Sequence, residues 1–224
     1  MTQSPVTPVS TPPNPVPPLE NGDRLTRQEF ERRYQTATHI KKAELIEGVV
    51  YVAAALRFKS HAEPHSNLHG WLWFYAMATP PVELGIEPTI RLDWDNEPQP
   101  DGVLRIPAEV GGISRLSEDD YIEGAPELVF EIAASSAAID LNAKMNAYRR
   151  NGVQEYLVWE VFNNQLSWFQ LVDGRYLPLE TDPDGILKSH VFPGLWLAAS
   201  ALLSGDMSQV VEVTQQGLAS LEHQ

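Results

Sequence analysis

Runs of hydrophobic residues separated by polar segments are clearest between Pro126 and Trp159, in the stretch PELVFEIAASSAAIDLNAKMNAYRRNGVQEYLVW. This stretch starts and ends with apolar runs, over 127–132 and 154–160, which are typical of interior β-strands. Between them the pattern changes to that of a helix. Because a crossover of this length joins parallel strands, the two apolar runs are predicted to be parallel neighbours in one sheet.

The helical part of the stretch has one apolar face. Leu141, Met145 and Tyr148 are separated by four and then three positions, so their side chains lie on the same side of a helix. Asn151-Gly152 follows as a typical C-terminal stop. The sequence therefore predicts a strand-helix-strand crossover.

The rest of the chain alternates between strand and helix patterns. The predicted elements are a helix from Thr26 to Tyr34, a hairpin turning at Glu47-Gly48, a helix from His65, short strands in EPTIRLDWD and PDGVLRIP, a hairpin turning at Asp173-Gly174, and a strand leading into a helix in HVFPGLWLAASALLSGD. Together these elements predict an α/β fold with a mixed sheet flanked by helices.

Proline content sets one boundary of the predicted domain. The stretch MTQSPVTPVSTPPNPVPPLENG is rich in proline and has no periodicity, so residues 1–22 are predicted to be a disordered tail. We expect one folded domain over 23–205 and a C-terminal tail over 206–224, which beyond Met207 is either a weak helix or frayed.

Composition and charge restrict the classes of function. The chain has 224 residues and no cysteine, and its 30 acidic and 16 basic residues give a net charge of −14. This charge excludes a generic nucleic-acid coat, and a polyanionic substrate would need a locally basic or metal-loaded groove. No apolar run approaches the roughly 20 residues of a membrane span, and no secretion signal is visible at the N-terminus. We expect a cytoplasmic protein that has no membrane partner.

One acid stands in an unexpected place. Glu131 lies in the middle of an apolar strand, where a lone carboxylate costs several kcal/mol unless a partner meets it. Asp101 begins another predicted strand, and Lys144 lies in the crossover helix. Two carboxylates at strand ends are the oxygen ligands that a hard divalent cation requires. A nearby lysine can position water or stabilise charge on a phosphate, so phosphodiester hydrolysis is chemically plausible.

Three segments carry a family resemblance. QPDGVLRI, EGAPELVFEI and DLNAKMNAYRRNGVQEYLVW resemble the Uma-two family of restriction-endonuclease-like proteins, in the PD-(D/E)xK nuclease superfamily. AELIEGVVYV and FPGLWL are also similar to family segments, and the resemblance extends from about Phe30 to Ala199. It implies a restriction-endonuclease-like core that binds Mg²⁺ or Mn²⁺ and cleaves DNA.

The resemblance also implies roles for particular residues. Asp101 and Glu131 match the acidic motif residues, and the backbone carbonyl of Ile132 would complete the metal shell. The usual superfamily lysine falls at Ala133, and Lys144 matches the position to which the family lysine has moved. Because duplex cleavage usually requires two sites, a homodimer is expected.

Each of these residues also has an ordinary structural interpretation. Asp101 could bond its own turn, Glu131 could pair with a buried base, and Lys144 could form a surface ion pair with Asp140. Among further acids in the first hairpin, Glu44 and Glu47, we name Glu47 as a secondary candidate.

The histidines and aromatic residues give weaker signals. His65 matches a family position and is a second additional candidate, which could orient a phosphate or water. The four-residue spacing of His65 and His69 suits zinc, but the sequence identifies no third ligand, because His61 lies beyond Pro64. The aromatic residues of WLWFY are interpreted as core, with dimer contact as a further role.

Three functions therefore stay open. The first is a metal-dependent DNA endonuclease with Asp101, Glu131 and Lys144 as its catalytic residues. The second is a nuclease-fold binding or assembly protein that has lost turnover, and the third is a metal hydrolase acting on a small phosphorylated substrate.

Overall fold

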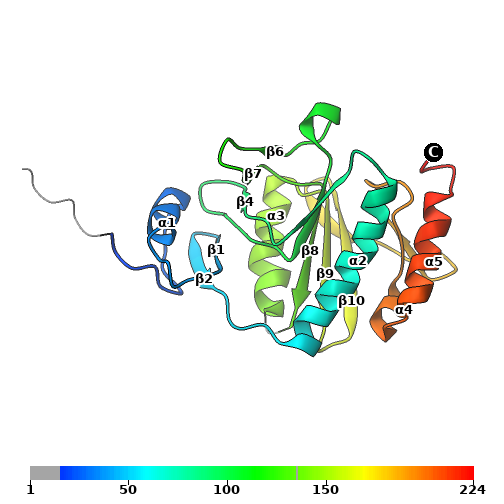
Figure 1. Cartoon of the computed structure of the whole chain (residues 1–224), viewed down its shortest axis with the longest axis horizontal. Coiled ribbons are helices and arrows are strands. Elements are labelled where there is room, and N and C mark those ends of the chain that lie inside the picture. Colours follow the sequence, from blue (N-terminus) through cyan, green and yellow to red (C-terminus); the bar gives the residue numbers. More distant parts are fainter. Residues whose placement is uncertain (1–15, 135) are drawn as a thin grey trace, which may run out of the picture.

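A six-stranded mixed sheet forms the centre of the computed structural model, which describes residues 16–134 and 136–224 (Figure 1). Its strands, in spatial order, are β11 (Arg175–Pro178), β10 (Gln165–Val172), β9 (Glu155–Glu160), β8 (Leu128–Ala133), β5 (Gly102–Arg105) and β3 (Glu83–Ile86). Strands β8 and β9 are parallel, and the other neighbours are antiparallel. Every residue of β8 and β9 is buried, which confirms the predicted pair of interior strands.

The crossover between β8 and β9 is helical, as predicted. It consists of a π-helical turn, η3 (Ile139–Lys144), which continues directly into α3 (Met145–Asn151). Gly152 ends α3 with a φ of 87°, a conformation that glycine adopts without steric cost, so the predicted stop is confirmed.

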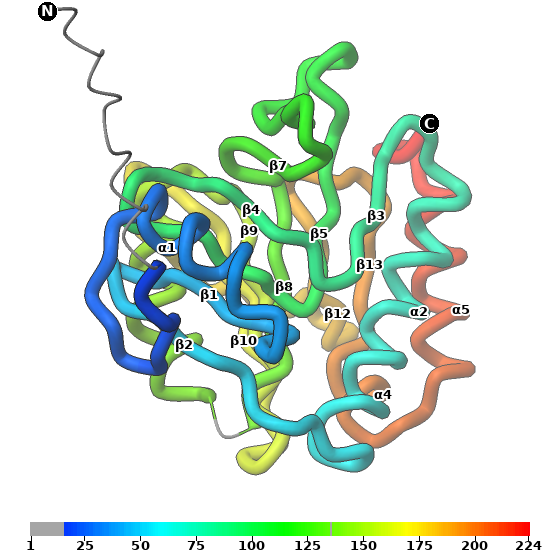
Figure 2. Tube along the Cα trace, turned by 60° about the vertical axis from the view of Figure 1, so that its left-hand side comes forward, coloured from blue at the N-terminus to red at the C-terminus, as the bar shows by residue number. Residues whose placement is uncertain are grey.

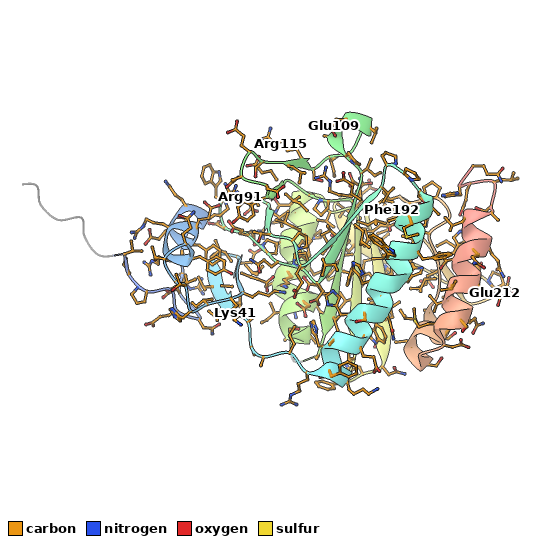
Figure 3. All side chains as sticks on the ribbon, in the orientation of Figure 1. Lys41, Arg91, Glu109, Arg115, Phe192 and Glu212 are labelled. Carbon is orange, nitrogen blue, oxygen red and sulfur yellow. The ribbon has the colours of Figure 1, made fainter. Side chains whose placement is uncertain are left out.

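Side chains of β8 alternate between two hydrophobic layers. Phe130 and Ile132 pack with helices α2 (Glu63–Ala78), α4 (Ala199–Ser204) and α5 (Met207–Leu218), whereas Val129 packs on the opposite face with residues of α3. Figure 3 shows Phe192 in the layer beside α2. Because neighbouring strand residues face opposite sides, Glu131 points toward the crossover helices.

Smaller elements surround the sheet. Helix α1 (Arg27–Tyr34) and the hairpin β1 (Ala43–Ile46) and β2 (Val49–Val52) enclose a separate apolar cluster around Phe30. The remaining elements are η1 (Phe58–Ala62), β4 (Ile90–Arg91), η2 (Ala108–Val110), β6 (Arg115–Leu116), β7 (Ile122–Glu123), β12 (Ile186–Lys188) and β13 (Trp196–Ala198). In the part of the chain that the structure describes, no helix is long and apolar enough to cross a membrane.

The predicted first helix, both predicted hairpins and the helix containing His65 are confirmed. Thr26 precedes α1 as expected, but its side chain makes no capping hydrogen bond. In α2, Trp71 and Tyr75 are fully buried, whereas Trp73 is 54% exposed, so the predicted core role holds for only part of the WLWFY segment.

One strand of the central sheet differs from the prediction. The edge strand beside β5 is β3, which had no strand pattern, and the predicted strand in EPTIRLDWD forms β4 of a smaller sheet. β3 contains Gly85 and has no fully buried residue, so its pairing with β5, rather than its own sequence, determines its conformation.

The packed region extends past both predicted limits of the domain, residues 23 and 205. Leu19 is buried, and the backbone N–H of Gly22 donates to the carbonyl of Val50 at 2.8 Å. Residues 206–224, predicted as a tail, contain α5, which packs beside α2 (Figures 1 and 2). Val210 and Val213 of α5 belong to the main core, so the packed region continues beyond residue 205. Residues 1–15 of the predicted N-terminal tail lie outside the described residues.

Candidate active site

Asp101 lies directly before β5 and is held by two distant segments. Its Oδ2 accepts a 2.6 Å hydrogen bond from the backbone N–H of Ile132, and its Oδ1 lies 3.1 Å from Nε2 of His61. Burial raises the pKa of Asp101, but the contact with His61, the N–H of Ile132 and the charge of Lys42 together outweigh burial, so the pKa lies below its ordinary value. These partners differ from those of an aspartate that bonds only its own turn.

Glu131 meets a buried lysine from the crossover. Its Oε1 accepts hydrogen bonds from Lys144 Nζ at 3.0 Å and from the hydroxyl of Tyr148 at 2.9 Å. These two donors explain how an acid is tolerated inside an apolar strand.

Lys144 is only 5% exposed and lies among three carboxylates. Its Nζ is 2.8 Å from Glu44, 3.0 Å from Glu131 and 3.7 Å from Asp140. The pair with Asp140 therefore exists, but it is buried and is the longest of the three contacts, so a simple surface ion pair does not describe this lysine.

The structure brings Glu44, rather than Glu47, to this cluster. Glu44 in β1 contacts Lys144 and accepts a 2.7 Å hydrogen bond from the backbone N–H of Gln99. Glu47 lies at the hairpin turn with a φ of 52°, and its carboxylate pairs with Arg150 at 2.8 Å. The secondary candidate Glu47 is therefore directed away from the cluster by the turn geometry.

Two histidines approach Asp101, one from η1 and one from the start of α2. His65, a predicted candidate, has its Nε2 2.9 Å from the backbone carbonyl of Asp101. His61 contacts the carboxylate of the same residue but was not a candidate, because Pro64 separates it from the predicted helix. The signal that could have identified it is its four-residue spacing from His65. His69, which has the same four-residue spacing from His65, is not part of the group of His61, His65 and Asp101.

These groups line one cleft of about 660 Å³. Its walls include the carboxylates of Glu44, Asp101, Glu131 and Asp140, together with Lys42, Lys144 and His61. Ile132 also lines it, with its N–H directed at Asp101.

The charges in the cleft suit a divalent cation. Burial raises the pKa of Glu131 well above its ordinary value; Lys144 opposes this shift, and Asp140, Asp101 and Glu44 increase it. Burial likewise raises the pKa of Asp140. Four carboxylates against the three basic side chains of Lys42, Arg57 and Lys144 leave an excess of negative charge, which a bound cation would neutralise with the oxygen ligands that Mg²⁺ and Mn²⁺ prefer. The donor set therefore fits the implied metal.

Comparisons with known proteins identify the fold and the family. The mixed sheet with its helical crossover defines a restriction-endonuclease-like α/β fold. Residues 27–200 match the Uma2 family, described as "Putative restriction endonuclease", and the chain belongs to this family.

A solved structure has a similar fold. A "putative nuclease" from Anabaena variabilis matches with a TM-score of 0.56 and 16% sequence identity, over 72% of this chain and 89% of that chain. Among curated proteins, no sequence matches this chain.

Proposed function

We propose that this protein is a metal-dependent endonuclease that hydrolyses DNA phosphodiester bonds. The observation that carries the proposal is the convergence of Asp101, Glu131 and Lys144 on one acidic cleft, although they come from separate elements. Membership of the Uma2 family supports a nuclease function in general. DNA as substrate and the need for a metal are the specific parts of the proposal.

Asp101, Glu131 and the backbone carbonyl of Ile132 would hold Mg²⁺ or Mn²⁺, and Glu44 offers a further oxygen. A bound cation of this kind supplies Lewis-acid stabilisation of phosphate charge and lowers the pKa of bound water. It would also offset the net charge of −14, which otherwise repels a polyanion.

Lys144 acts in this proposal as a fixed positive charge and hydrogen-bond donor. Burial lowers its pKa, but Glu131, Glu44 and Asp140 outweigh burial and hold the pKa well above its ordinary value. An ammonium that keeps its proton cannot serve as the base. Its role is therefore to position water and to stabilise the negative charge that develops on the phosphate.

Two further expectations accompany this proposal. We expect a homodimer, because cutting both strands of a duplex usually requires two active sites. We also expect the protein to act in the cytoplasm.

A plasmid-nicking assay tests the proposal. The wild type should nick DNA with Mg²⁺ or Mn²⁺, and EDTA should abolish nicking. Lys144→Arg, which keeps the charge but changes its position, should reduce nicking more than Lys59→Arg, since Lys59 is exposed and pairs with Glu63 outside the cleft. Cleavage that survives EDTA would refute the proposed mechanism.

A nuclease-fold binding or assembly protein without turnover is the second candidate. It is favoured by Ala133 at the usual lysine position and by the three carboxylates that already surround Lys144. In this case Asp101→Ala and Lys144→Ala would leave partner binding intact, and the wild type would nick no DNA.

A further inference from the structure

We propose that His61, His65 and Asp101 form a binding site for a divalent transition-metal ion. The inference names the class of metal that the cleft selects. It rests on the proposed function only for the role of the ion in cleavage. Its two histidines lie outside the set of carboxylates described above.

The three residues already converge. One ligand atom from each of them lies within 4.8 Å of the others, with His61 Nε2 and Asp101 Oδ1 only 3.1 Å apart. Metal–ligand bonds of about 2.0–2.2 Å place two adjacent ligands of one ion roughly 3 Å apart. The spacing between His61 and Asp101 therefore fits two ligands of a single ion, which would replace their direct contact.

The local fold explains this convergence. His61 lies in the π-helical turn η1 and His65 in the first turns of α2, so the four-residue spacing places both rings on one helical face. Pro64 does not interrupt this face, because it occupies the first turn of α2. The backbone N–H of Ile132 fixes Asp101 opposite the two rings. Separate rigid elements thus hold the ligands before an ion arrives.

Among the described residues, the second ring nitrogen of His61 has no hydrogen-bond partner. With Nε2 facing Asp101, Nδ1 of His61 is buried and accepts or donates no hydrogen bond among residues 16–134 and 136–224. A buried polar atom without a partner is uncommon in folded proteins. An ion bound between Nε2 and Asp101 would leave Nδ1 as it is, so the Nε2–Oδ1 spacing, and not this nitrogen, supports the site.

The chemistry of the ligands defines the metal class. Two imidazoles and one carboxylate suit divalent transition metals such as Co²⁺ and Zn²⁺, and Mn²⁺, although it favours oxygen ligands, accepts imidazole more readily than Mg²⁺ does. Mg²⁺ prefers an all-oxygen environment, which Asp101, Glu131 and Glu44 would provide instead. The chain should therefore bind transition metals more tightly than Mg²⁺, and His61 should be responsible for the difference.

Titrations of the full chain with Co²⁺ and with Mn²⁺ test this inference. Co²⁺ should produce ligand-field absorption bands, and calorimetry should give a higher affinity for Mn²⁺ than for Mg²⁺. His61→Ala and His65→Ala should each weaken Mn²⁺ binding by at least about tenfold while changing Mg²⁺ binding less. His69→Ala is the matched control, because His69 lies one turn further along the same helix but outside the group. It should bind like the wild type.

The ratio of Mn²⁺ to Mg²⁺ affinity is measured within each variant, so it does not depend on the amount of folded protein. An unchanged ratio in both His61→Ala and His65→Ala would overturn the inference. If these variants also keep Mg²⁺-dependent nicking, the proposed function stands without the histidine site. If the wild type binds Co²⁺ through His61 but does not nick DNA with any of the ions, the metal site stands and the proposed nuclease function fails.

Discussion

Lys144 Nζ lies 3.0 Å from Glu131 Oε1, and both side chains are almost completely buried. The lysine belongs to the crossover and the glutamate to the strand before it, so the pair connects β8 to the helix that covers it. The same contact shields an acid inside the sheet and places a positive charge in the cleft.

Removing this lysine should destabilise the fold. Lys144→Met leaves Glu44, Glu131 and Asp140 buried without their shared cation, and loss of one partner of a buried pair costs about 3–5 kcal/mol. Urea unfolding at pH 7 measures this loss. The double variant Lys144→Met/Glu131→Gln should recover part of it, and a cost below about 1 kcal/mol for the single variant would contradict the buried network.

The two acids of the first hairpin should behave differently. Glu44→Gln removes a carboxylate from the cleft and should lower nicking, by about 10²-fold if Glu44 contributes directly to charge stabilisation. Glu47→Gln changes only an exposed pair with Arg150, so its nicking rate should stay within about twofold of the wild type. Equal effects of both substitutions in the same assay would contradict this assignment.

Glu155 should make stability depend on pH. Burial raises its pKa to about 7, although hydrogen bonds from the backbone N–H groups of His190 and Val191 and from the hydroxyl of Ser189 oppose the shift. The folded state therefore holds a proton that the unfolded state has lost between about pH 4.5 and 7. This contribution to the free energy of unfolding is present below about pH 4.5, falls as the pH rises, and is lost above about 7.

The size of this loss follows from the shift in pKa. A change of about 2.5 pKa units corresponds to on the order of 3 kcal/mol. Denaturant unfolding at several pH values between 4.5 and 8 gives the free energy of unfolding of the wild type and of Glu155→Gln. The wild-type value minus the Glu155→Gln value should fall by this amount as the pH rises. A flat difference between the two proteins would refute the assignment.

Helix α5 should be an integral part of the fold. A Cβ at Gly217 would lie 2.2 Å from the carbonyl oxygen of Gly194, so Gly217→Ala should displace the helix and cost about 1–3 kcal/mol. Gly70→Ala is the matched control in α2, because a Cβ there meets nothing within 4 Å. It should be neutral or stabilising by up to about 1 kcal/mol. Equal stabilities in urea would mean that α5 is dispensable.

Sequence patterns predicted the elements whose signals are local. The apolar runs around Glu131 and in 154–160, the helical spacing of Leu141 and Tyr148 and the stop at Gly152 all describe one continuous crossover. The parallel pairing of its two strands was predicted correctly, because strands joined by a short helical crossover are usually parallel neighbours in one sheet. The convergence of Asp101, Glu131 and Lys144 was also expected, whereas their catalytic roles stay predictions.

Features that depend on distant contacts were not predictable. β3 is a strand only because it pairs with β5. Glu44 and Glu47 look alike in sequence, but Glu44 lies within β1 whereas Glu47 lies three residues later in the turn with a positive φ, so their side chains point in different directions. His61 was hidden because Pro64 reads as a break, although proline in the first helical turn leaves the helix intact.

Mn²⁺ binding and plasmid nicking, measured on the same samples of wild type and Asp101→Asn, test the central claim most directly. Asn keeps the shape of the side chain but removes the charge that would hold the cation. We predict that the wild type binds Mn²⁺ and nicks DNA, and that both activities are lost in Asp101→Asn, whose folding is checked by circular dichroism. A wild type that binds no divalent ion, or an Asp101→Asn protein that nicks at the wild-type rate, would contradict the account.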